Sequence, residues 1–295
     1  SGAGQFANAA SLIEPALHTW RLSQTEPDEV FLQGLTDLSR VRMSESRIAD
    51  AEALMRETLA TAEQLYDAPH VRIALALLNL GDVLRRREHL DDAASVLKRA
   101  LAMMRTIYGD DHLRVANTMG ALGVVELRRR DLESATLHIQ SAVSWCEKPG
   151  LHATRSCIEL HAIQTELALA GNHLEEADIS SARALTLTRE LFPDGHRWTV
   201  RLWLLRAELD LRRGDASTAL DLCDKAQDLL ATLGAEDSFT AESVLARRAS
   251  ALNVLGRSNE ALADITQALS LWDQLVPDGR LHRIQLLDEL ASIQT

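Results

Sequence analysis

Small and apolar residues recur along the chain at helical spacing, and this pattern repeats every 42 residues. Alanine occupies seven positions that are each 42 residues apart, and another small residue follows each of them seven positions later. In most repeats an apolar residue stands between the two. Residues spaced four and three apart lie on one face of an α-helix, so each segment predicts an amphipathic helix. The seven alanines are Ala9, Ala51, Ala93, Ala135, Ala177, Ala219 and Ala261.

A second series of positions predicts another helix before each of these segments. Twelve residues before the alanines stand residues that are mostly small, such as Gly81, Gly123 and Ala207, and four residues earlier stand mostly large apolar ones, such as Leu77. Short polar turns such as Gly214-Asp215 separate the two helices of a unit. Each repeat is therefore predicted to be a helix-turn-helix unit, in which we name the first helix A and the second helix B.

Proline and turn residues mark the predicted boundaries between units. Five of the six prolines stand where a B helix is expected to end and the next A helix to begin. They are Pro27, Pro69, Pro149, Pro193 and Pro277. The pattern predicts an all-α fold of about fourteen helices within a single solenoid domain over residues 1–295. Its parts are a lone B helix at 5–24, helix pairs at 28–69, 70–111, 112–151, 152–195, 196–237 and 238–279, and a terminal A helix at 280–295.

The order of small and apolar positions resembles the tetratricopeptide repeat, and the resemblance covers nearly the whole chain. The 42-residue period is similar to a variant of that repeat found in kinesin light chains and in bacterial signalling proteins, and so are the joints Tyr108–His112 and Phe192–His196. The resemblance implies a right-handed superhelix whose concave wall is formed by the A helices. It also implies that this wall binds a peptide or another protein, as stacked repeats create an extended concave surface.

Outward projection of the A helices from their packing residues predicts which side chains line this wall. Asn79 stands where the kinesin-light-chain type of repeat has asparagines that hold the backbone of a bound peptide. The resemblance therefore implies that Asn79 binds the backbone of a peptide. The other predicted wall residues are mostly charged. The complete set is Asn79, Asp82, Arg85, Arg86, Asn117, Val124, Arg128, Glu166, Arg201, Glu208, Arg212 and Asn253.

Runs of arginine end several of the A helices, at Arg85–Arg87, Arg128–Arg130 and Arg212–Arg213. Two interpretations remain open. Guanidinium groups bind carboxylates through paired hydrogen bonds. The side chains of Arg85, Arg86 and Arg128 are therefore a candidate binding site for an acidic segment of a partner. Alternatively, these cations stay solvated and offset the dipole at the helix C-terminus.

Charge and composition exclude several functions. The 295 residues carry 31 Lys and Arg against 43 Asp and Glu, a formal net charge of −12, so we expect no nucleic-acid partner. No apolar stretch approaches the length of a membrane span, and no insertion into a membrane is expected. Spacing indicates no metal site, no cofactor and no catalytic motif, so we expect the chain not to be an enzyme. The three cysteines, Cys146, Cys157 and Cys223, are expected to be buried free thiols.

The leading hypothesis is a protein-interaction or peptide-binding module that serves as the regulatory or sensory part of a larger bacterial signalling protein. Two alternatives are a structural platform that oligomerises through its ends, with the terminal helix 280–295 as the contact, and the repeat region of a transcriptional regulator. An enzymatic alternative would need a composite site that includes Glu166 or Glu208. We expect a cytoplasmic location, or a periplasmic one for a piece of a membrane-anchored parent.

Overall fold

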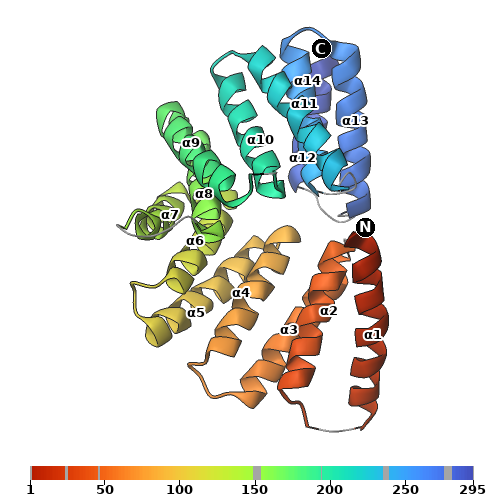
Figure 1. The fold of residues 1–295 in the computed structure, drawn as a ribbon, viewed down its shortest axis with the longest axis vertical. Coiled ribbons are helices and arrows are strands. Elements are labelled where there is room, and N and C mark those ends of the chain that lie inside the picture. Colours follow the sequence, from red (N-terminus) through yellow and green to blue (C-terminus); the bar gives the residue numbers. More distant parts are fainter. Residues whose placement is uncertain are drawn as a thin grey trace. The chain divides into compact units, whose positions relative to one another are not determined.

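The computed structural model confirms the prediction of an all-α helical-repeat solenoid. It describes residues 2–23, 26–45, 47–148, 154–193, 195–234, 239–275 and 281–294, and these ranges hold fourteen α-helices and no β-strand. The chain forms two compact units, Ser1–Trp145 and Cys146–Thr295, whose helices are labelled in Figure 1. The expected single domain over residues 1–295 stays a prediction.

Each unit is a series of antiparallel helices in which neighbours along the chain pack together. The first unit contains α1 (Gly2–Ser23), α2 (Glu29–Ser44), α3 (Ile48–Leu65), α4 (Val71–Arg86), α5 (Leu90–Tyr108), α6 (Leu113–Arg128) and α7 (Leu132–Cys146). The second contains α8 (Arg155–Ala170), α9 (Leu174–Leu191), α10 (Arg197–Arg212), α11 (Ala216–Leu233), α12 (Phe239–Val254), α13 (Ser258–Leu275) and α14 (Leu281–Gln294). The even-numbered helices are the A helices, and α4 contacts α6 while α8, α10, α12 and α14 contact one another in turn.

The repeated small residues form the contacts between the two helices of a pair. Six of the seven alanines that recur every 42 residues, from Ala51 to Ala261, are fully buried. A Cβ atom added at Gly81 would lie 2.6 Å from Cγ of Leu97 on α5, and one at Gly123 would lie 2.5 Å from Cγ1 of Ile139 on α7. The small residues are therefore required because they let helix A lie directly against the side chains of helix B.

A left-handed residue ends each A helix that is followed by a described turn. Glu88, Arg130 and Asn172 have φ near +60°, at 62°, 61° and 58°, and Gly214 and Gly256 occupy the same place in later repeats. The amide of the next residue donates to a carbonyl in the last turn of the helix, as His89 does to Leu84. This is the Schellman arrangement, which sets the sharp turn into helix B.

The expectation of three free thiols is wrong for two of the cysteines. Cys146, at the end of α7, and Cys157, in the first turn of α8, form a disulfide with their Cα atoms 5.6 Å apart. Their separation of eleven residues along the chain gives no hint of this proximity. Cys223 is free and buried, as predicted. Pro149 and Pro277 lie outside the described residues.

Candidate protein-binding site

The predicted wall residues of the first unit lie on two A helices that contact each other. Asn79, Asp82, Arg85 and Arg86 are on α4, and the other three, Asn117, Val124 and Arg128, are on α6. Asn79 and Arg128 are exposed, and the remaining five are partly buried. The structure thus brings the proposed basic stretch onto neighbouring helices.

Asp82 partly neutralises that basic stretch. Its carboxylate accepts hydrogen bonds from Arg85 at 2.5 Å and from Arg86 at 3.1 Å. Burial alone would raise the pKa of Asp82, but the two guanidinium groups together lower it to about 2. Asp82 is therefore ionised at neutral pH, and the group of three side chains carries a single net positive charge.

In the second unit, the wall residues form ion pairs between successive A helices. Glu166 on α8 accepts a hydrogen bond from Arg201 on α10 at 2.8 Å, and the Arg201 guanidinium lies 5.3 Å from the ring centroid of Trp198. Burial opposes the charge on Arg201, yet the carboxylate of Glu166 raises the pKa of the guanidinium above its usual value. Arg201 is thus held between a carboxylate and an aromatic face.

Glu208 on α10 forms the next pair along this wall. It binds Arg212 of its own helix at 2.5 Å and also pairs with Arg247 of α12. Burial lowers the pKa of Arg247 to about 10, while Glu289 on α14 acts in the opposite direction, so Arg247 is a cation at neutral pH. Arg247 was not among the predicted wall residues. It stands at the position of its repeat that is equivalent to Asn79, and this equivalence could have predicted it as a wall residue.

Arg212 and Asn253 complete the set. Arg212 donates from Nη1 to the carbonyl of Leu169 in the last turn of α8, at 2.6 Å. Arg212 therefore supports the interpretation that these cations offset a helix dipole, but the dipole is that of α8 and not that of α10, which carries Arg212. Asn253 is partly buried near the end of α12.

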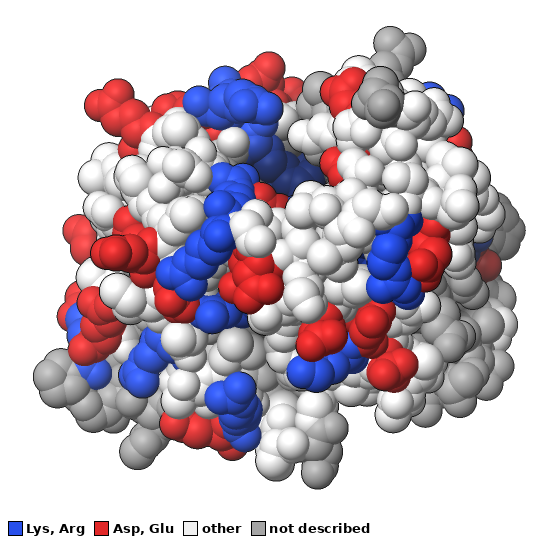
Figure 2. Space-filling view, turned by 90° about the horizontal axis from the view of Figure 1, so that it is seen from above, with Lys and Arg blue, Asp and Glu red and all other residues white. Residues whose placement is uncertain are grey.

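Acidic and basic side chains lie beside each other in several patches of the face shown in Figure 2, and uncharged surface separates these patches. Many of the charged side chains of the wall are therefore paired with charges of the opposite sign within the chain.

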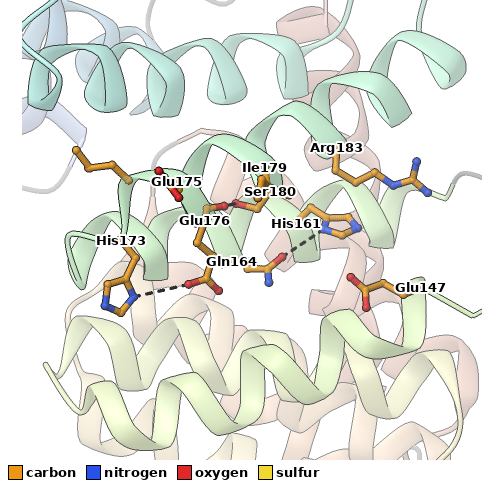
Figure 3. A pocket seen from close by; sticks show the side chains of 10 residues that line it. Glu147, His161, Gln164, His173, Glu175, Glu176, Ile179, Ser180 and Arg183 are labelled. Carbon is orange, nitrogen blue, oxygen red and sulfur yellow. Dashed lines mark hydrogen bonds and ion pairs between the residues drawn. The ribbon is translucent and has the colours of Figure 1, made fainter.

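An open cavity of about 700 Å³ lies against α8 and α9 (Figure 3). Two pairs of its lining side chains contact each other, His161 with Gln164 and His173 with Glu176. The buried His161 has Nδ1 3.4 Å from Oε1 of Gln164, and Ser180 bonds Thr165 at 2.8 Å. Burial lowers the pKa of His161, which keeps the imidazole neutral. His161 is thus a buried neutral imidazole beside Gln164, and the charged side chains of Glu147 and Arg183 also line the cavity.

Within the described ranges, no group of three His, Cys, Asp or Glu side chains is arranged to hold a metal ion. Of the helices described, none has both the length and the apolar character needed to cross a bilayer. The arrangement offers paired charges on a ridged helical surface, which suits the recognition of another polypeptide.

The fold and this wall define a helical-repeat protein of the kind that scaffolds interactions. The sequence model of the tetratricopeptide repeat family matches residues 32–106, which span α2 to α5. Residues 32–106 therefore match the tetratricopeptide repeat family, and the described residues that follow continue the same helix-pair fold.

Solved structures share this fold at low sequence identity. BtubC (BKLC) from P. vanneervenii is 17% identical with a TM-score of 0.59, over 79% of this chain and 93% of BtubC. A tetratricopeptide repeat protein from Parabacteroides merdae is 14% identical with a TM-score of 0.60, over 99% and 93%. A Rap protein complexed with Competence and Sporulation Factor is 17% identical with a TM-score of 0.66, over 92% and 72%. A comparison with curated proteins gives no match.

Proposed function

We propose that the chain binds a peptide or protein segment along the wall formed by its A helices, as the regulatory or sensory part of a larger bacterial signalling protein. The observation that carries this proposal is the set of partly exposed charged side chains that neighbouring A helices bring together, with Glu166–Arg201 as the clearest pair. The side chains of Arg201 and Glu166 are 33% and 29% exposed, so a partner can reach them while they hold each other in place.

Two further observations support the proposal. Trp198 beside Arg201 adds aromatic surface of the kind enriched in binding hot spots. The Rap protein with a similar fold was solved in complex with Competence and Sporulation Factor, so the fold can accommodate a bound partner. An acidic partner segment would meet Arg85, Arg86 and Arg128, and the carboxylate of Asp82 already binds Arg85 and Arg86 as such a segment would.

The test is a selection of binding peptides from a random display library, followed by calorimetry with the best peptide. Replacement of Arg201 and Arg247 by glutamine should weaken binding by about tenfold or more, as expected for the loss of charged hydrogen bonds. Lys225→Gln on the B helix α11, where the side chain is exposed, is the matched control and should leave affinity unchanged. Peptides that bind equally well to the double variant would contradict a site on this wall.

The acidic partner needs a separate test. The variant with Arg85, Arg86 and Arg128 all changed to glutamine removes the positive charge without adding carboxylates beside Asp82. It should lose affinity for selected peptides that contain acidic residues and keep its helicity in circular dichroism. Unchanged affinity would eliminate the acidic-segment proposal.

A second candidate function is oligomerisation through the terminal helix. Leu286 and Ile293 of α14 are buried in the core of the second unit, whereas Ile284 and Leu287 are 53% and 37% exposed. Apolar side chains on one exposed face favour contact with another surface. Light scattering should give a mass above that of one chain, and Ile284→Ser with Leu287→Ser should return it to one chain. A single-chain mass for the unmodified protein would refute this candidate.

The disulfide bears on the compartment. Disulfides persist in oxidising compartments and are rare in the bacterial cytoplasm, so Cys146–Cys157 favours the periplasmic alternative over the cytoplasmic one.

A further inference from the structure

Three A helices begin with the same unusual cap. His70, His112 and His196 directly precede α4, α6 and α10 in extended backbone conformation. Nδ1 of each imidazole accepts a hydrogen bond from the backbone N–H two residues later, at 3.2, 3.1 and 3.2 Å. Because an amide can only donate, Nδ1 must be unprotonated in each case, which requires the neutral tautomer with the proton on Nε2.

Each of these histidines also stacks on an aromatic ring four residues earlier. The ring centroids are 4.0 Å apart for Tyr66 and His70, 4.4 Å for Tyr108 and His112, and 4.2 Å for Phe192 and His196. The interplanar angles are at most 18°. The aromatic residue lies at the end of a B helix, so the stack connects that end to the start of the next A helix. We name each stacked and capped pair a histidine joint.

The sequence repeat indicates that the two rings act together. At the positions equivalent to these histidines, Asp28 caps α2 and Thr154 caps α8 through side-chain oxygens. Four residues before Asp28 and Thr154 stand Gln24 and Gly150, neither of which is aromatic. In these five repeats, the aromatic residue is present only where the cap is a histidine. Histidine is not among the preferred capping residues, so the stack supplies a reason for its use.

Nearby charges distinguish the three joints. The guanidinium of Arg114 lies 5.7 Å from the Tyr108 ring at the His112 joint, and that of Arg155 lies 5.4 Å from the Phe192 ring at the His196 joint. Burial, and then the charges of Arg155 and Arg197, lower the pKa of His196.

Carboxylates near the other two joints are arranged differently. Asp110, in the loop before His112, is paired with Arg105 at 3.0 Å. At the remaining joint, Glu29 accepts a hydrogen bond from Tyr66 at 2.8 Å and pairs with Arg72, and its carboxylate acts electrostatically on His70. Glu29 would offset the charge of a protonated His70, whereas among the residues that the structure describes only the charges of Arg155 and Arg197 act on the pKa of His196.

We propose that the His112 and His196 joints are pH-sensitive contacts, in which the cap of the A helix is lost when the imidazole is protonated. A proton taken from solvent by Nδ1 converts the acceptor of the cap into a donor, so the N–H of Arg114 or Trp198 loses its partner. The resulting cation also lies at the positive end of the helix dipole and near arginine side chains.

The direction of the pH dependence follows from the folded state's preference for neutral imidazole. An unfolded histidine binds a proton below about pH 6.5, whereas His196 in the folded chain binds it only at lower pH. The stabilisation is therefore complete above the unfolded value and is lost as the pH falls from there through the folded value. If the proposed function is correct, acidification also loosens the A helices that carry the binding wall.

The experiment measures amide hydrogen exchange by NMR on the full chain between about pH 7.5 and pH 5.0, corrected for intrinsic exchange. We expect the Arg114 and Trp198 amides to lose about fivefold in protection, in keeping with the loss of one cap. The Cys157 amide, which donates to the hydroxyl of Thr154 at 3.1 Å, is an internal control that should not change. Equal loss at Cys157, or no loss at Arg114 and Trp198, would overturn the proposal.

Variants separate the titration from a merely structural role. His112→Asn and His196→Asn keep a capping oxygen that does not titrate, so both should retain protection at about pH 5.0. His173→Asn is the matched control, because His173 precedes α9 without capping it through its side chain, and its pH response should equal that of the unmodified chain.

Ring ¹⁵N shifts of the unmodified protein give a second readout that does not depend on the folding of a variant. They should report unprotonated Nδ1 at His112 and His196 near pH 7.5. A proton on Nδ1 at that pH, or asparagine variants that lose protection as the unmodified chain does, would refute the proposal. This test does not involve a binding partner, so its outcome is independent of the proposed function.

Discussion

Gly81→Ala tests whether the small position of helix A is fixed by direct contact with helix B. The added Cβ would lie 2.6 Å from both Cγ and Cδ2 of Leu97, whereas carbon atoms in contact are about 3.5–4.0 Å apart. Leu97 is 1% exposed and has little room to move. Overpacking of this kind costs about 1–3 kcal/mol, and the higher helix propensity of alanine returns about 1 kcal/mol. We therefore expect a net loss of about 0–2 kcal/mol in the free energy of unfolding.

The assay is urea denaturation followed by circular dichroism, carried out as a double-mutant cycle with Leu97→Ala. Leu97→Ala alone should cost about 2–5 kcal/mol through the cavity it leaves. In that background Gly81→Ala no longer meets the leucine, so it should stabilise the chain by about 1 kcal/mol. The change of sign between the two backgrounds is the diagnostic result. If Gly81→Ala stabilises the unmodified chain by the same amount, the close approach of α4 and α5 does not constrain this position.

Three further outcomes follow from the structure. Arg130→Gly should raise the free energy of unfolding by up to about 1 kcal/mol in urea denaturation, since arginine is held at φ 61° where later repeats have glycine; a lower value would contradict this. Asp82→Asn should destabilise the chain at pH 7 by at most about 1 kcal/mol, because the Asp82 side chain is 45% exposed. Its pKa is lowered to about 2, so the stabilisation is present above the unfolded value and lost as the pH falls towards 2; an undiminished difference near pH 2 would contradict the cause. Alkylation without reductant, followed by mass spectrometry, should leave the native chain unlabelled, because Cys223 is buried and burial raises the pKa of its thiol to about 12. After unfolding, one group should be added, at Cys223. Three added groups would exclude the Cys146–Cys157 disulfide.

The helical content and the interior of each pair could be predicted from the sequence. The alanines from Ala51 to Ala261 stand at one position of a repeated helical pattern, and such a pattern reports directly which face is buried. The A-helix location of wall residues such as Glu166 and Arg201 followed from the same period. Whether these residues bind a partner stays a prediction.

The ion-pair partners could not be predicted from the sequence. Glu166 and Arg201 are 35 residues apart, whereas Glu208 and Arg247 are 39 apart, so the pairs do not follow the 42-residue period. Long side chains reach across a helix interface in whichever direction the local crossing allows, and the period does not encode that direction. For the same reason Asp82 was grouped with the arginines as a wall residue without being recognised as their counter-ion.

The sequence by itself determined that this protein is built from two-helix repeats and that the repeated alanines of those helices are buried. These properties arise from local hydrogen bonding and helical periodicity, so they are visible in a few dozen consecutive residues. Only the tertiary structure decided which charges neutralise one another, that Cys146 reaches Cys157, and that an aromatic ring at the end of one helix stacks on the histidine that caps the next. Those contacts depend on how chain segments approach in space, to within about an ångström, and a sequence pattern does not specify distances on that scale.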